Sequence, residues 1–299
     1  MPNLGRSVHC ACAALALALL STQTLAQGGG GQGNPRMREA TQLDIAGKHT
    51  ESRAIFQELI DAAQNPRDKA AAQRAMARSA GFTGDCAMAI RYEEMVIAYH
   101  VTREQSEPQD AFYQQGEMSN EAARICADAG KVDDAERMYR RGSDLGNKEP
   151  EPRTHPRSLW DFRLAHAMTR ITAQRGNRAE AHRHMADARG ALDGIGRADT
   201  ALARGQERFY QYLPGYIALF TNDDTWAEVE LARAAAIPGN DRDPQIQYFL
   251  GLVYEKAGQA EKAKAQFQKA YDLANTHTPP AAFARPAARK KLGLAPSAP

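Results

Sequence analysis

Residues 244–274 read PQIQYFLGLVYEKAGQAEKAKAQFQKAYDLA, and this stretch decides the fold that we expect for the whole chain. Small and apolar residues recur at helical spacing on both sides of Gly258. A glycine suits a tight turn between two helices because it adopts a left-handed backbone without steric cost. Gly251 and Ala263 would let the two helices approach closely, and Phe267 would fill the space between neighbouring helices. The stretch therefore predicts a pair of antiparallel helices.

This helical hairpin resembles the tetratricopeptide repeat (TPR) family, in which helix–turn–helix units stack into a right-handed superhelix. The residues that match the signature of that family are Leu250, Gly251, Tyr254, Gly258, Ala263, Phe267 and Ala270. Two positions depart from it, because Gln247 stands where an aromatic residue is usual and Asn275 stands where a proline is usual. The resemblance covers about residues 244–275 and is weaker elsewhere.

The same arrangement of small residues recurs around five earlier turns. The six turn residues are Gly47, Gly84, Gly130, Gly176, Asn222 and Gly258, at intervals of 37, 46, 46, 46 and 36 residues. Asn222 replaces glycine at its turn because asparagine also tolerates the left-handed conformation. The hairpin at Gly84 is the least regular, since Glu93 stands where an aromatic side chain is expected. Regular intervals of this length indicate one structural unit that is repeated.

We therefore expect an all-α fold, a right-handed α-α superhelix that forms a TPR-like solenoid of about six helical hairpins. The alternative all-α fold is a globular bundle. It is less favoured because the helices carry apolar stripes and are not apolar all round. Prolines fall mostly between hairpins, where they end or begin helices. Pro214 is the exception and is predicted to kink its helix or to delay its start.

The N-terminus has the layout of a secretory signal peptide. Arg6 precedes an apolar run from Cys10 to Leu20, and the small residues of 24–26 offer a cleavage site after Ala26. The run is too short to span a bilayer, although an uncleaved anchor is the alternative. We expect a periplasmic or secreted protein with no membrane span in the mature chain.

Four segments follow from this assignment. They are the signal peptide at 1–26, a glycine-rich flexible linker at 27–36, the TPR-like repeat domain at 37–278, and a Pro/Ala-rich capping segment and tail at 279–299. The glycine run of the linker is no phosphate-binding loop, because no strand precedes it.

Two of the four cysteines, Cys10 and Cys12, would leave with the signal peptide. Cys86 follows the Gly84 turn by two residues, and Cys126 precedes the Gly130 turn by four. Both then lie at the same end of two neighbouring antiparallel helices. In an oxidising compartment we expect them to form a disulfide.

Composition and motifs give no support for an enzyme or a nucleic-acid-binding protein. The formal net charge is only +2, with 38 basic and 36 acidic residues. His182 and His184 point about 200° apart on a helix and cannot share a metal ion. We expect no catalytic residue, no metal and no cofactor, although an enzyme with an unrecognised site remains as an alternative.

The resemblance implies a concave groove that is lined by the first helix of each hairpin and holds a peptide or a partner helix. Positions thirteen, ten and six residues before each turn would face this groove; Glu117 is one of them. The candidate partner-binding residues are Asn120, Arg124, Arg163, His166, Arg170, Phe209, Tyr212 and Tyr216. Arginine pairs with carboxylates, and aromatic rings offer rigid apolar surface. The alternative is that the aromatic residues belong to the core and the arginines to a solvated face.

The function that we expect is a non-enzymatic interaction scaffold that holds a protein or peptide partner, as the resemblance implies, within an assembly of the cell envelope. The alternative is an accessory subunit that tethers an envelope enzyme or a glycan-export complex through its convex face. Neither the identity of the partner nor the oligomeric state follows from the sequence.

Overall fold

The computed structural model describes residues 33–295, and every regular element among them is an α-helix. The expected signal peptide and most of the expected linker lie outside these residues. The helices are α1 (Pro35–Ala46), α2 (His49–Ala62), α3 (Pro66–Phe82), α4 (Cys86–Val101), α5 (Pro108–Asp128), α6 (Val132–Gly146), α7 (Arg157–Gln174), α8 (Arg178–Ala198), α9 (Thr200–Gln211), α10 (Leu213–Phe220), α11 (Asp224–Ala235), α12 (Pro244–Lys256), α13 (Ala260–Leu273) and α14 (Pro279–Lys291). The all-α prediction is confirmed.

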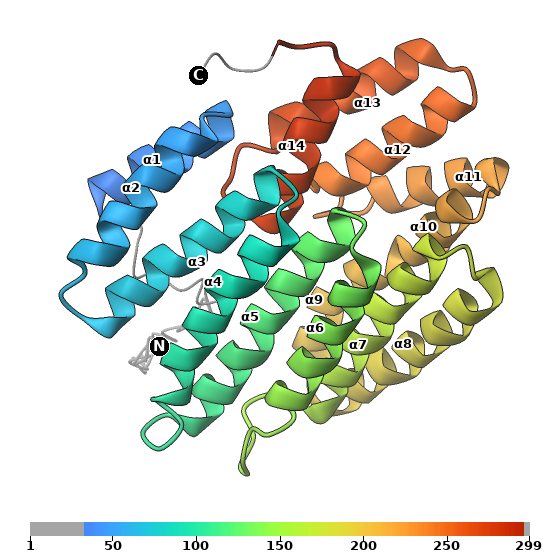
Figure 1. Ribbon diagram of the computed structural model, residues 1–299. Coiled ribbons are helices and arrows are strands. Elements are labelled where there is room, and N and C mark those ends of the chain that lie inside the picture. The colour runs from blue at the N-terminus through green and yellow to red at the C-terminus, as the bar shows by residue number, and fades with distance from the viewer. Residues whose placement is uncertain (1–32, 296–299) are drawn as a thin grey trace, which may run out of the picture.

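Most helices form antiparallel pairs that follow one another along the chain, as in a TPR-like solenoid (Figure 1). The pairs are α1–α2, α3–α4, α5–α6, α7–α8, α10–α11 and α12–α13. All six predicted turn residues have a positive φ. Asn222, with φ 59°, is the one non-glycine residue of the described part in this conformation. The six hairpins and their turns were therefore predicted correctly, including the irregular one at Gly84.

The two helices of a hairpin meet at small residues. A Cβ atom added to Gly251 would lie 2.6 Å from Cε1 of Phe267 on the partner helix. In the preceding hairpin, a Cβ added to Gly215 would lie 2.7 Å from Cγ of Leu231. Real Cβ atoms do not approach other atoms so closely, and only glycine allows these helices their spacing.

The fifth hairpin differs from the others because its first helix is broken. Helix α9 ends at Gln211, and α10 begins at Leu213 with Pro214 in its first turn. Pro214 has no N–H group to donate to the carbonyl four residues earlier, so the helix is interrupted there. The late helix start predicted from Pro214 is confirmed, and α9 becomes a separate element.

The C-terminal helix α14 lies between the first and the last hairpins (Figure 1). It packs against α3 and α5 on one side and against α12 and α13 on the other. Its alanine face is completely buried and consists of Ala281, Ala282, Ala284 and Ala288. Phe283 packs on Tyr248 and Phe249, with ring centroids 5.4 and 5.7 Å apart. The expected capping segment is thus a packed helix as far as Lys291, which joins the two ends of the solenoid.

A buried carboxylate completes this junction. Asp44 of α1 is fully buried and accepts hydrogen bonds from Nδ1 of His49 and Nε2 of His277, both at 2.9 Å. The hydroxyl of Ser79 donates a third at 3.1 Å. His277 comes from the segment between α13 and α14, so Asp44 ties the first hairpin to the last.

The predicted disulfide between Cys86 and Cys126 is confirmed, with 4.6 Å between the two Cα atoms. It joins the first residue of α4 to the last turn of α5. Both cysteines are buried among small residues of neighbouring hairpins. The bond therefore fixes the stacking of the second hairpin on the third.

Replacing both cysteines, as Cys86→Ala/Cys126→Ala, is expected to lower the free energy of unfolding by about 4 kcal/mol, because the cross-link closes a chain segment of roughly forty residues. Urea unfolding of the oxidised protein and of the variant measures the difference. The wild-type protein unfolded in a reductant should approach the variant. A loss of less than about 1 kcal/mol would contradict a stabilising bond.

Glu93 is an acid in the core of the second hairpin. Its side chain is fully buried, and the carboxyl group of Glu121 lies close enough to interact with it. Burial, and next the charge of Glu121, raise the pKa of Glu93 well above its usual value. Glu93 therefore occupies the place of an aromatic residue, and its burial favours the protonated form.

This burial predicts a pH-dependent stability. The unfolded chain releases the proton of Glu93 near pH 4, and the folded chain holds it to a higher pH. The folded state then binds more protons, so stability falls as pH rises through that window, by at most about 1.4 kcal/mol per pH unit. Glu93→Gln should remove this dependence and be increasingly more stable than wild type as pH rises.

Urea unfolding at a series of pH values tests this expectation. The control is Glu58→Gln, because the Glu58 side chain is 64% exposed and lies outside the core. If the free energies of unfolding of wild type and Glu93→Gln changed with pH in parallel, Glu93 would titrate alike in the folded and unfolded chain.

Candidate binding cup between helices α5, α7 and α9

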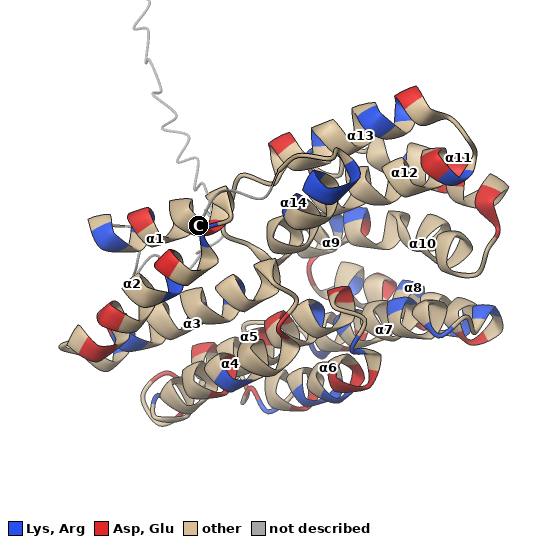
Figure 2. Ribbon diagram, turned by 45° about the horizontal axis from the view of Figure 1, so that its top comes forward, with Lys and Arg blue, Asp and Glu red and all other residues tan. Residues whose placement is uncertain are grey.

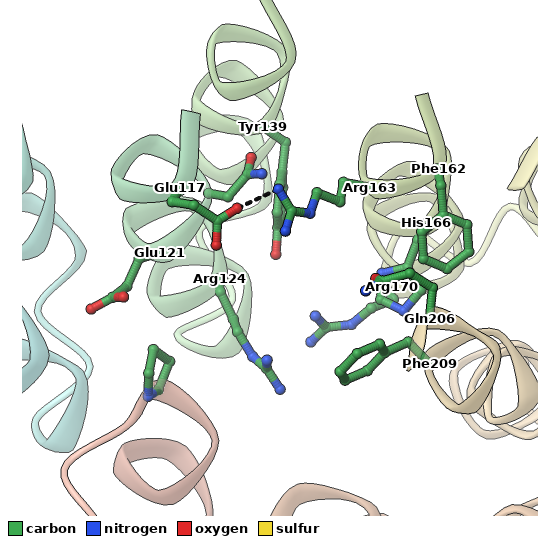
Figure 3. A pocket seen from close by; sticks show the side chains of 12 residues that line it. Glu117, Glu121, Arg124, Tyr139, Phe162, Arg163, His166, Arg170, Gln206 and Phe209 are labelled. Atoms are coloured by element: carbon green, nitrogen blue, oxygen red, sulfur yellow. Dashed lines mark ion pairs between the residues drawn. The ribbon is translucent and has the colours of Figure 1, made fainter. Parts of the chain in front are cut away.

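Residues of the predicted groove line a cavity of about 310 Å³, which we call the cup. Helices α5 and α7 form its main walls, Tyr139 of α6 contributes between them, and α9 closes one side (Figure 3). Pro279, at the start of α14, completes the lining. The cup is therefore built by two hairpins, α5–α6 and α7–α8, together with α9 and α14, which stand outside the hairpin pattern.

Most of the candidate residues, which were chosen by their distance before each turn, lie together at this cavity. The candidates that line the cup are Asn120, Arg124, Arg163, His166, Arg170 and Phe209. Glu117, one turn before Asn120 on α5, lines it as well. Their common position follows from the stacking of hairpins, since equivalent positions of neighbouring first helices lie side by side.

Tyr212 and Tyr216 differ from this expectation. Tyr212 is 6% exposed and Tyr216 is completely buried, and both belong to the main hydrophobic core. The ring of Tyr212 packs edge-on against His166, and that of Tyr216 lies under the guanidinium of Arg170. The break at Pro214 brings α9 over the cup, so that Phe209 faces the cavity and the two tyrosines lie beneath it.

Arg163 is balanced by a carboxylate across the cup. One of its nitrogens lies 2.5 Å from Glu117 of α5, and another donates to the hydroxyl of Tyr113 at 3.1 Å. Its guanidinium also lies 4.7 Å from the ring centroid of Trp160. These contacts hold α7 against α5 and leave Arg163 with little charge to offer a ligand.

A chain of polar contacts holds the other two arginines. Arg170 donates to Oδ1 of Asp128 at 2.9 Å. Gln245 of α12 donates to the same oxygen at 2.7 Å, and its own carbonyl oxygen accepts from Arg124 at 2.6 Å. Because Gln245 is neutral, Arg124 has no carboxylate in direct contact among the described residues. Nε of both arginines is buried without a hydrogen-bond partner there.

Glu121 adds no free negative charge to the cup. Its carboxylate is 2.7 Å from Arg74 and 2.5 Å from Arg78, both on α3. Burial alone would raise the pKa of Glu121, but the two guanidinium charges outweigh it and lower the pKa well below its usual value. Figure 3 shows Glu121 pointing away from Arg124, while Arg124, Arg170 and Phe209 point into the same space.

Counted together with Arg74 and Arg78 of α3, which do not line the cup themselves, the arginines around it outnumber their carboxylate partners. The arginines around it are Arg74, Arg78, Arg124, Arg163 and Arg170, and their carboxylate partners are Glu117, Glu121 and Asp128. His166 does not add to the excess, because burial and next the charge of Arg170 lower its pKa to about 3. An anionic group would be attracted to this cavity, where limited solvent weakens screening.

Five lining residues were missed by the sequence analysis: Glu121, Tyr139, Phe162, Gln206 and Pro279. Glu121 and Phe162 adjoin predicted positions, so a wider helical face would have included them. Gln206 and Pro279 lie on α9 and at the start of α14, whose positions depend on contacts between distant parts of the chain.

Two further kinds of site were sought in the part of the chain that the structure describes. Within residues 33–295, no group of three or more histidine, cysteine, aspartate or glutamate side chains is arranged to hold a metal ion. In the same residues, the helices are too short or too polar to cross a membrane. Figure 2 shows basic and acidic residues intermixed over the helices, without an extended face of one sign.

Comparison with known proteins gives one match. A family model described as tetratricopeptide repeat matches residues 244–277, which comprise α12, α13 and the segment after them. No curated protein matches the chain. The matched residues contain the hairpin in which the sequence pattern is clearest.

The burial of Tyr212 yields a prediction that separates core from binding surface. Tyr212→Ala is expected to lower the free energy of unfolding by about 3 kcal/mol, because it leaves a cavity under His166. Tyr212→Phe keeps the ring and should change stability by about 1 kcal/mol or less. Thermal unfolding of both variants measures the effect, and an unchanged melting temperature for Tyr212→Ala would show that the ring is not part of the core.

Proposed function

We propose that this protein is a periplasmic or secreted scaffold that holds the acidic segment of a protein partner in the cup, as part of an envelope assembly. The tetratricopeptide repeat match over residues 244–277 suggests a protein-interaction scaffold, because such repeats are generally non-catalytic and bind protein partners. Stacked hairpins with a concave face suit that role.

The observation that carries the proposal is that Arg124 and Arg170 point into the cup with a single carboxylate, Asp128, in direct contact with the pair. Arg170 is 2% exposed, and it shares its one carboxylate partner, Asp128, with Gln245. Arg124 donates to the neutral Gln245. Charges held in place before a ligand arrives require little reorganisation, so a carboxylate that enters the cup gains the interaction at low cost.

Phe209 adds an apolar component to this site. Its ring faces the arginines across the cup, in a position to contact an apolar side chain beside the carboxylate (Figure 3). The favoured partner segment therefore combines an acidic residue or a chain terminus with one apolar side chain.

The compartment is inferred from the cysteines. A buried disulfide between Cys86 and Cys126 is typical of proteins in oxidising compartments. The signal peptide expected at residues 1–26 agrees with this assignment, so we place the scaffold in the periplasm or outside the cell.

The exposed face of α11 favours a second candidate function, tethering of a larger envelope complex. Trp226 and Val229 lie one helical turn apart there and are 47% and 53% exposed. Exposed aromatic and aliphatic side chains on one helix face are typical of protein contacts. In that case the partner would cover α11 and leave the cup free.

A direct binding experiment tests the cup. Fluorescent ten-residue peptides that differ in their number of carboxylates, and in one leucine or phenylalanine, are titrated with the protein by anisotropy. We expect binding to require a carboxylate and to weaken with salt, because the attraction is partly screened. Arg124→Gln should weaken binding by about 1–2 kcal/mol with little loss of stability, since its partner is neutral.

The matched control is Arg140→Gln, which removes an arginine of α6 that is 55% exposed and lies outside the cup. It should bind as wild type does. Equal binding of peptides without carboxylates, or an unchanged affinity for Arg124→Gln, would remove the cup from the proposed function. Weaker binding by Trp226→Ala in the same assay would instead favour tethering through α11.

A further inference from the structure

Helix α9 is anchored differently from the other walls of the cup. None of its residues is buried, whereas eleven residues of α7, on the opposite wall, are. Its main helix neighbour is α8, which precedes it in the chain, and it has few contacts with α10. Yet Gln206 and Phe209 of this loosely packed helix close one side of the cup.

The polar contacts that hold α9 down are few and partly exposed, and its apolar residues Leu202, Ala203, Phe209 and Tyr210 pack against the main core as half-buried side chains. Arg189 of α8 lies 2.9 Å from Glu207, and its guanidinium stacks 4.0 Å from the ring centroid of Tyr210. On the other side, Nδ2 of Asn240 donates to the carbonyl of Arg208 at 3.0 Å. Exposed ion pairs of this kind contribute little to stability, so detaching α9 costs far less than moving α7.

Both ends of α9 have the geometry of hinges. Asp199 separates α8 from α9 with an extended backbone, φ −150° and ψ 102°. At the other end, Pro214 interrupts the helical hydrogen bonds between α9 and α10. A rigid twelve-residue helix between two such breaks can rotate without disturbing the hairpins on either side.

His166 lies beneath α9, and the accessibility of its ring depends on the position of that helix. Nε2 of His166 is buried and has no hydrogen-bond partner among the described residues. The same ring is hydrogen-bonded to the backbone of Phe209. The His166 ring is half-buried and lines the cup, but its Nε2 atom is buried, so reagents in solution reach this nitrogen more readily when α9 moves away.

We propose that α9 is a hinged lid on the cup, which opens about Asp199 and Pro214 to admit the partner segment and closes Gln206 and Phe209 over it. This rests on the proposed function of the cup as a binding site. In the closed form, shown here, Phe209 covers His166. The partner shifts the balance between open and closed forms only as far as it binds one better than the other.

The lid is tested in the absence of any partner by modification of His166 with diethyl pyrocarbonate. Mass spectrometry of peptides gives the rate at His166 relative to that at His182, which is exposed on α8. Because neutral imidazole is the reactive form and His166 is neutral at pH 7, its rate measures access to the ring. The ratio therefore measures how often the lid opens.

An engineered disulfide between α8 and α9 would prevent the hinge at Asp199 from opening. A Cβ atom added to Gly196 would lie 3.7 Å from Cβ of Ala203, within the range for a disulfide. In the oxidised Gly196→Cys/Ala203→Cys protein we expect the His166 to His182 ratio to fall by about tenfold. The matched Gly196→Ser/Ala203→Ser protein should keep the wild-type ratio.

A second variant weakens the attachment of α9 and tests the lid even if the engineered disulfide does not form. Arg189→Gln removes both the ion pair with Glu207 and the stack on Tyr210, so the ratio should rise by about threefold. Arg140→Gln is the control and should leave it unchanged. Equal ratios in the disulfide-linked and serine proteins, or no rise with Arg189→Gln, would overturn the lid. Because no peptide is present, failure of the lid is distinguishable from failure of the proposed function.

Discussion

The close approach of two helix backbones at a glycine is the constraint on which each hairpin of this kind depends. In the last hairpin Gly251 leaves space for the ring of Phe267, and in the fifth Gly215 leaves space for Leu231. Helices at this spacing bury a narrow stripe each, so an alanine-rich chain with few aromatic residues still fills its core. The next hairpin then stacks on the flat side of the previous pair, and the concave face that carries the cup follows from this repetition.

Much of this architecture was predictable because its determinants are local. A turn residue such as Asn222 is recognised from its own hairpin. The spacing from the turn that brings Arg163 and Arg170 to the cup is likewise set within one hairpin, so the sequence pattern was enough to locate them. Tyr212 and Tyr216 were placed in the groove by the same spacing, and although a break at Pro214 was predicted, its effect on the direction of these side chains was not. The roles of Gln245 and Pro279 could not be predicted from the sequence, since their positions depend on contacts between segments more than a hundred residues apart.

Asp128 links the closure of the solenoid to the charge of the cup. The same oxygen accepts from Arg170 of α7 and from Gln245 of α12, and Gln245 in turn holds Arg124 of α5. Contacts that bring the last hairpin against the third therefore also set the direction of two arginines. A change in the packing of α12 would alter the electrostatics of the cup without touching any residue on its walls.

The junction at Asp44, His277 and α14 has a consequence for the way such a chain changes in length. An open solenoid gains or loses units at little cost, because each repeat contacts only its neighbours. Here α14 contacts α3 as well as α12, and His277 reaches Asp44 across the span of the whole repeat domain. Insertion or deletion of one hairpin would separate these partners. The closed arrangement therefore behaves as a single cooperative domain with a fixed number of hairpins, and it changes by substitution within hairpins.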